Sequence, residues 1–245
     1  MQNDVPRLEL AGPYMNAAGS LGFVPKAAQP AWPPLAAFVT NPISLQPRRT
    51  SQGTRLLTFP GGVLLHTGWP NPGLRRAVQQ HAAAWARASQ SIILNLLIDE
   101  PASLAQVMPH LEALDNLAGL ELSIAADASA QLAGELVRAA QSKWPLIAQL
   151  SLARAEELAT ACLTAGASAI SLGPLRGSLP DARGRLVSGR LYGPALYPQA
   201  LAVTQALQRA GAPVIAAGGV ETAQQAEAFL AAGALAVQVD VALWK

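Results

Sequence analysis

Two adjacent glycines, Gly218 and Gly219, form the strongest candidate for a ligand site in this sequence. They follow an apolar run, and Thr222 with Gln225 three residues later has the pattern of a capping box at a helix start. Glycines let backbone amides approach a ligand closely, and a helix N-terminus favours an anion. The motif predicts phosphate binding, and its structural alternative is a tight turn in which the glycines serve packing alone.

Other side chains suited to chemistry occur in loops. His66 is a candidate proton shuttle, although a solvated loop histidine is the simpler interpretation. Trp69 is an aromatic residue that fits a lid over a planar ligand. A basic stretch suggests either an anion site, pairing with Asp181, or a solvated loop, and its members are Arg176, Arg183, Arg185 and Arg190.

The composition excludes several classes of function. The 245 residues are 51% hydrophobic and 13% charged, with a net charge of +2, and this balance argues against a nucleic-acid or membrane partner. The single cysteine, Cys162, excludes a disulfide framework, and we expect no metal site. The N-terminal residues lack the basic and apolar regions of a signal peptide, so we expect a cytoplasmic protein.

A recurring unit indicates the elements that must position these residues. Residues 163–172, 207–216 and 230–239 each read as a helix end, an Ala-Gly-Ala turn and a short apolar strand. Such strands are typical of a parallel sheet that is buried on both faces. Helices are predicted over 74–88, 130–141 and 197–209. Strands are predicted at 14–18, 37–41, 91–96, 119–124, 146–150, 169–172, 213–217 and 236–239.

Eight strands alternating with helices predict an α/β fold, a (β/α)8 TIM barrel, as a single domain over residues 1–245. Segment 61–67 could form a ninth strand and is interpreted as part of the long connection after the second strand, and 175–201 is interpreted as a long connection as well. The sequence stops soon after the eighth strand, so we expect the final helix to be absent or very short.

Five segments carry a resemblance to a known family, in the family's own order, and they are 14–23, 37–48, 66–73, 175–201 and 214–239. The sequence resembles the soluble dihydroorotate dehydrogenases, FMN-dependent flavoproteins of pyrimidine biosynthesis that are built on a (β/α)8 barrel. The resemblance implies FMN contacts at Ala17, Ala18, Gly19, Ser20, Asn41, Gln149, Gly193, Gly218, Gly219 and Asp240. It implies a pocket for a ring substrate at Leu65, His66, Gly68, Trp69, Asn71 and Gly173.

The sequence departs from the family at its chemically important positions. Asn41 and Gln149 stand where the family has lysines near the flavin, so two cations that would favour a negative charge are lost. Ala126 stands at the position of the catalytic base, which leaves Ser123 and Asp127 as candidates. After the last strand Asp240 replaces a glycine, and a carboxylate there repels a flavin phosphate.

Two functions remain open from the sequence. The first is a barrel with degraded active-site chemistry that does not oxidise dihydroorotate and acts as a small-molecule-binding or accessory protein. The alternative is an FMN-dependent oxidoreductase of the dihydroorotate dehydrogenase family. The low surface charge is compatible with a homodimer or with a partner subunit.

Overall fold

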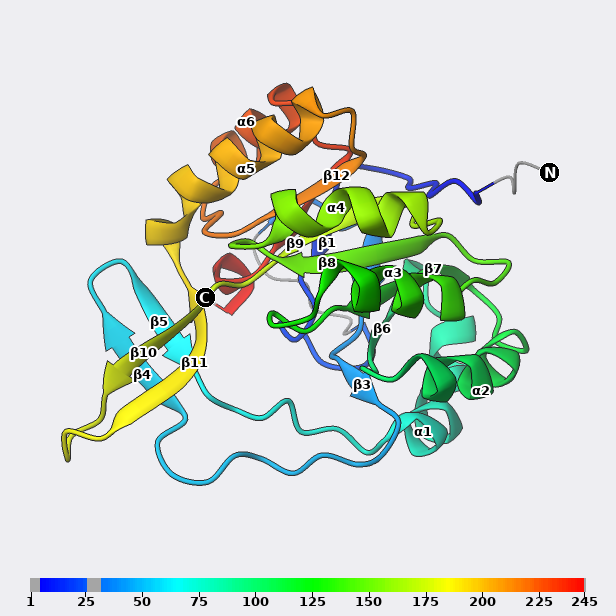
Figure 1. The fold of residues 1–245 in the computed structure, drawn as a ribbon, viewed down its shortest axis with the longest axis horizontal. Coiled ribbons are helices and arrows are strands. Elements are labelled where there is room, and N and C mark those ends of the chain that lie inside the picture. The colour runs from blue at the N-terminus through cyan, green and yellow to red at the C-terminus, as the bar shows by residue number, and fades with distance from the viewer. Residues whose placement is uncertain (1–4, 26–31, 245) are drawn as a thin grey trace.

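The computed structural model describes residues 5–25 and 32–244, and its centre is a closed barrel of parallel strands (Figure 1). The strands run in the order β2-β1-β13-β12-β9-β8-β7-β6, and pairing of β2 with β6 closes the barrel. All eight predicted strands are confirmed, and the (β/α)8 fold with them. The barrel strands are β1 (Tyr14–Asn16), β2 (Ala37–Val39), β6 (Ser91–Leu97), β7 (Leu117–Ser123), β8 (Leu146–Ser151), β9 (Ala169–Gly173), β12 (Val214–Ala217) and β13 (Ala236–Val239). A short extension, β3 (Ile43–Ser44), pairs with the end of β6.

Helices alternate with these strands and pack around the barrel (Figure 1). The predicted capping box is confirmed, since Thr222 Oγ1 accepts from the Gln225 amide at 3.3 Å and Gln225 Oε1 accepts from the Thr222 amide at 3.1 Å. Among the described residues, only a 3-10 turn, Val241–Trp244, follows β13. The helices are α1 (Leu74–Ala86), α2 (Pro101–Leu111), α3 (Ala130–Ala139), α4 (Ala155–Thr164), α5 (Tyr197–Arg209) and α6 (Ala223–Ala231).

The barrel strands are buried on both faces, which explains their continuous apolar runs. One face packs against the surrounding helices, and the other fills the barrel with a small apolar layer that includes Met15, Ile93, Ile147 and Ile215. The interior changes from apolar to polar toward the carboxyl ends of the strands, where functional residues of such barrels lie. No helix in the described part of the chain has the length and apolar character needed to cross a membrane.

A second, antiparallel sheet lies beside the barrel at the carboxyl ends of its strands (Figure 1). Interpreting 61–67 and 175–201 purely as connections is therefore wrong, because both segments contain strands of this sheet. Its two outer strands alternate between exposed and half-buried residues, so they lack the apolar runs that identify barrel strands. In spatial order they are β10 (Arg176–Pro180), β11 (Leu186–Tyr192), β5 (Gly62–Leu65) and β4 (Leu56–Phe59).

Candidate functional site

A fully buried carboxylate, Glu121 on β7, organises a polar layer inside the barrel. Its Oε1 accepts from Ser171 Oγ at 2.7 Å and from Gln238 Nε2 at 2.6 Å. Its Oε2 accepts from Asn95 Nδ2 at 2.7 Å and from Gln149 Nε2 at 3.4 Å. Burial raises the pKa of Glu121, while the hydrogen bonds oppose that rise. Sequence reasoning missed this residue, although a single acid within an apolar strand was a usable signal.

A cavity of about 520 Å³ opens above this layer at the carboxyl ends of β6 to β9. Its volume lies within the range of roughly 300–1,000 Å³ that is typical of small-molecule sites. Both candidates for the base, Ser123 and Asp127, line it. Ser123 Oγ lies 2.8 Å from Gln149 Oε1 and 3.0 Å from Asn95 Oδ1, so its hydroxyl proton is committed to the polar layer. The remaining lining residues include Arg48, Trp69, Asp99, Ala126, Gly173, Arg176 and Arg190.

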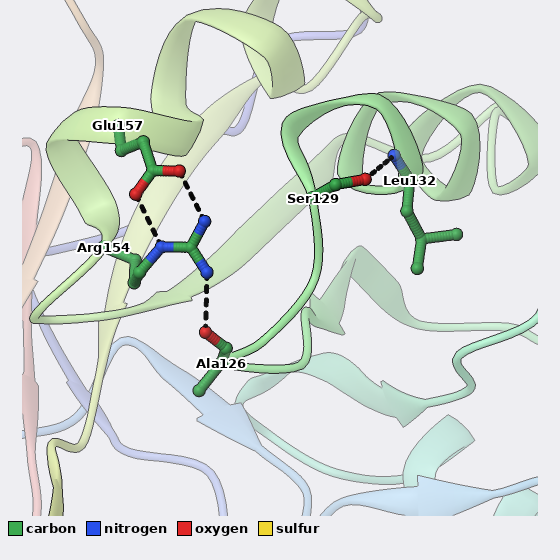
Figure 2. Close-up of polar contacts among 5 residues, drawn as sticks. All are labelled: Ala126, Ser129, Leu132, Arg154 and Glu157. Atoms are coloured by element: carbon green, nitrogen blue, oxygen red, sulfur yellow. Dashed lines mark hydrogen bonds and ion pairs between the residues drawn. The ribbon is translucent and has the colours of Figure 1, made fainter.

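The loop that carries Ala126 is held in place from two sides (Figure 2). The Ala126 carbonyl accepts from Arg154 Nη1 at 2.9 Å, and the same guanidinium pairs with Glu157 through Nε at 2.6 Å. On the other side, Ser129 Oγ accepts from the Leu132 amide at 3.1 Å and caps α3. This anchoring leaves a methyl group at the position implied for the base, and a methyl group accepts no proton.

The residues implied for FMN leave little space for it. Five of the ten line a space of only about 20 Å³ beside Tyr192, and they are Ala17, Ala18, Gln149, Gly218 and Asp240. This volume holds about one water molecule, whereas a ligand of flavin size needs the several hundred Å³ of a small-molecule pocket. In this arrangement the residues do not fit FMN.

The glycines near this space make close backbone contacts. A Cβ on Gly219 would lie 2.7 Å from the Gly193 carbonyl oxygen and from the Tyr197 amide nitrogen. Gly193 has φ +125°, and its Cβ would lie 2.5 Å from the Gly62 Cα. Only glycine permits these approaches, so the geometry favours the packing alternative for Gly219.

The amides at the start of α6 are engaged by the chain itself. Gln225 Oε1 accepts from the Glu221 amide at 2.8 Å and from the Thr222 amide. The Gln225 amide donates to Thr222 Oγ1, so two of the amides that this helix N-terminus would offer to a phosphate, those of Thr222 and Gln225, are engaged. The capping box therefore competes with the predicted phosphate site.

Asp240 places a buried carboxylate at the same end of the barrel. Its Oδ1 accepts from the Val241 amide at 2.6 Å. Burial raises the pKa of Asp240 to about 6, and the nearby Glu221 carboxylate adds to the rise. Two acidic groups disfavour a phosphate at the site predicted beside Gly218 and Gly219.

The raised pKa of Asp240 predicts a pH-dependent stability. The folded protein binds more protons than the unfolded chain between the ordinary aspartate pKa and about 6, so the free energy of unfolding falls as pH rises through this window. Asp240→Asn removes this loss and raises the free energy of unfolding at pH 7 by up to about 3 kcal/mol. Urea unfolding from pH 3.5 to 7.5, in steps of about 0.5 units, measures the effect. Exposed Asp115→Asn is the control, and an unchanged pH profile in Asp240→Asn would contradict the assignment.

Three other residues implied for FMN stabilise loops. Asn41 Oδ1 accepts from the Gly22 amide at 3.1 Å and joins two loops at the barrel mouth. Ser20 Oγ donates to the Ala17 carbonyl at 2.6 Å, and Gly19 has φ +86° in the same turn. Gln149 differs from them because it lines the cavity as well as the polar layer.

Of the six residues implied for the substrate pocket, Trp69 and Gly173 line the cavity. Asn71 is buried, and its side chain accepts from the Gly73 amide at 3.0 Å and donates to the Trp69 carbonyl at 3.0 Å. Asn71 therefore positions the loop that carries Trp69.

The other three members of this set lie in or beside the second sheet. Leu65 is paired with Arg190 across β5 and β11, and the His66 amide donates to the Arg55 carbonyl at 2.8 Å. Gly68 has φ +76° and packs against Ser51.

The predicted basic stretch divides into two environments. Arg185 pairs with Asp181 at 2.8 Å, as one interpretation expected, near the turn between β10 and β11. Arg176 and Arg190 instead line the cavity, together with Arg48 from the loop after β3. Sequence reasoning missed the role of Arg48, because nothing local links it to a stretch so distant in the chain. The described residues contain no cluster of histidine, cysteine or acidic side chains that could hold a metal ion.

The barrel fold and the sequence agree with one family. A family model described as dihydroorotate dehydrogenase matches residues 1–245, and the chain belongs to this family. Among its relatives, dihydroorotate dehydrogenase B (NAD(+)), catalytic subunit, of Pelobacter propionicus is 34% identical over 257 aligned positions, which cover 96% of this chain and 84% of the relative. The subunit of the same name from Geotalea uraniireducens is 32% identical and covers 98% and 86%.

Solved structures support the fold. A dihydroorotate dehydrogenase from Eimeria tenella in complex with ferulenol matches with a TM-score of 0.71 at 14% identity, covering 95% of this chain and 76% of that one. The ligand-free form of the Eimeria enzyme matches with a TM-score of 0.70 at 13% identity, over 85% and 72% of the two chains.

Proposed function

We propose that this chain is a member of the dihydroorotate dehydrogenase family that binds a small molecule at the barrel mouth and does not oxidise dihydroorotate. The observation that carries the proposal is the contrast between two spaces. The space lined by five of the ten residues implied for FMN is about 20 Å³, and the neighbouring cavity is about 520 Å³.

The chemistry of the site supports the same proposal. No cation from Asn41 or Gln149 is available to favour a negative charge on a reduced flavin or an anionic substrate. Ala126 supplies no base, and the Ser123 hydroxyl is engaged in the polar layer. Asp127 is the ionisable member of the two base candidates, and it lies on the wall of the cavity.

The relatives favour a second candidate function. They are named catalytic subunits of an NAD(+)-linked dihydroorotate dehydrogenase, and they align with almost the whole chain. An FMN-dependent oxidoreductase of this family is therefore the alternative. The word subunit in those names also supports a partner protein for this chain, in either an accessory or a catalytic role.

An absorption spectrum with an FMN titration separates the two functions. We expect the purified protein to be colourless in the visible range and to show no saturable uptake of added FMN. We also expect no reduction of a dye acceptor by dihydroorotate in the presence of FMN. A yellow protein with bound flavin, or turnover of dihydroorotate, would overturn the proposal and establish the oxidoreductase. A flavoprotein standard measured in parallel controls for the sensitivity of the assay.

A further inference from the structure

Three arginines from separate segments line one side of the large cavity. Arg48 lies in the loop after β3, and Arg176 and Arg190 lie directly opposite each other on the antiparallel strands β10 and β11. The ion pairs found in the described part of the chain involve Arg154 and Arg185 instead. The three cavity arginines therefore have no carboxylate at ion-pair distance within that part.

Their mutual repulsion makes this arrangement unfavourable without a counter-ion. Like charges directly opposite each other on paired strands are destabilising. Arg190 is half-buried, and its burial, together with the charges of Arg176 and Arg48, lowers its pKa to about 10. A bound anion would relieve both the repulsion and the incomplete solvation of Arg190.

Trp69 holds Arg190 in a fixed position. The guanidinium carbon of Arg190 lies 3.2 Å from the centre of the Trp69 ring. Trp69 has φ +49°, a strained conformation for a bulky residue, and such strain is concentrated at functional sites. The donors of a guanidinium lie in its plane, so a group held against a ring face keeps them available to an anion.

We propose that this cavity binds an organic phosphate ester, with its phosphate held by Arg48, Arg176 and Arg190. A phosphate ester carries roughly −1.5 to −2 charges at neutral pH, which suits several guanidinium groups better than the single charge of a monocarboxylate does. Asp99 and Asp127 also line the cavity, and their carboxylates accept hydrogen bonds from hydroxyl or amino groups on the rest of the ligand. The inference rests on the proposed small-molecule binding and adds the chemical class of the ligand.

Calorimetric titration of the full chain with ribose 5-phosphate tests the proposal. We expect saturable one-to-one binding that weakens as salt is added, because screening reduces the attraction between charges. Neutral ribose lacks the phosphate and should give no measurable binding. Arg176→Gln is expected to weaken the binding of ribose 5-phosphate by about tenfold or more, since it removes one charge-assisted contact. Arg183→Gln on the same hairpin is the control, because this exposed residue does not line the cavity.

The outcomes distinguish this inference from the proposed function. Equal binding of ribose and ribose 5-phosphate, or unchanged affinity in both Arg176→Gln and Arg190→Gln, would overturn the phosphate site. An absence of binding by both ribose 5-phosphate and pyrophosphate would also overturn it. Circular dichroism and thermal unfolding of each variant separate lost binding from lost folding, and the exposed position of Arg176 makes that variant the safer one. FMN is itself a phosphate ester, so FMN uptake that is lost in Arg176→Gln would support the phosphate site while overturning the proposed function. FMN uptake that persists in Arg176→Gln would contradict the proposed function alone, because that flavin would lie outside the arginine site.

Discussion

Gly193→Ala is expected to lower the free energy of unfolding by about 3–5 kcal/mol, which combines backbone strain with overpacking. The residue has φ +125°, and an added Cβ would lie 2.5 Å from the Gly62 Cα and 2.6 Å from the Gly61 carbonyl oxygen. Both contacts are with backbone atoms, so no side-chain rotation relieves them. Urea unfolding followed by tryptophan fluorescence measures the loss.

Gly211→Ala is the matched control for this prediction. Gly211 also has a positive φ, +76°, but nothing lies within 4 Å of an added Cβ. Gly211→Ala should lower the free energy of unfolding only by the strain of a left-handed alanine, about 1–2 kcal/mol. Equal losses in the two variants would show that the Gly61–Gly62 contact adds nothing and would refute the close approach at Gly193.

Glu121→Ala is expected to cost at least about 4 kcal/mol of unfolding free energy, because several buried donors lose their acceptor at roughly 1–3 kcal/mol each. These donors come from Asn95, Gln149, Ser171 and Gln238. Removal of a carboxylate that is costly to bury offsets part of the loss, so the total falls below the sum over the donors.

Glu121→Gln distinguishes the effect of losing the hydrogen-bond acceptors from the effect of losing the negative charge. The amide keeps one oxygen and places a donor where the second oxygen was, so we expect a smaller loss than for Glu121→Ala. Exposed Glu227→Ala on α6 serves as a control and should change stability by less than about 0.5 kcal/mol. Chemical unfolding of the three variants at pH 7 is the measurement, and a stability of Glu121→Ala equal to that of the unmodified protein would disprove the role of the polar layer.

The sequence predicts the barrel well because the signals of its elements are local. Each strand is a short, mostly apolar run, and Gly166, Gly211 and Gly233 adopt the predicted positive φ just beyond a helix, at +103°, +76° and +97°. The capping box at Thr222 is equally local, since its two partners are three residues apart.

The site is harder to predict because its residues meet only after folding. The polar layer around Glu121 takes side chains from β6, β7, β8, β9 and β13, and no spacing along the chain links them. Arg48 and Arg190 line the same cavity although they lie far apart in the sequence, and no local pattern links them. At Gly219 the residue type alone does not distinguish two roles, because close packing and phosphate binding both require a glycine there.

The second sheet has a consequence for the order of events during folding. Its β4–β5 and β10–β11 hairpins are local, but the central pairing of Leu65 with Arg190 joins residues about 125 positions apart. Loops of that length close slowly, and contacts of high sequence separation form late. The wall that brings Arg190 to the cavity should therefore assemble after the barrel strands β6 to β9, whose paired residues lie much closer in the sequence, so refolding molecules acquire secondary structure before they can bind a ligand.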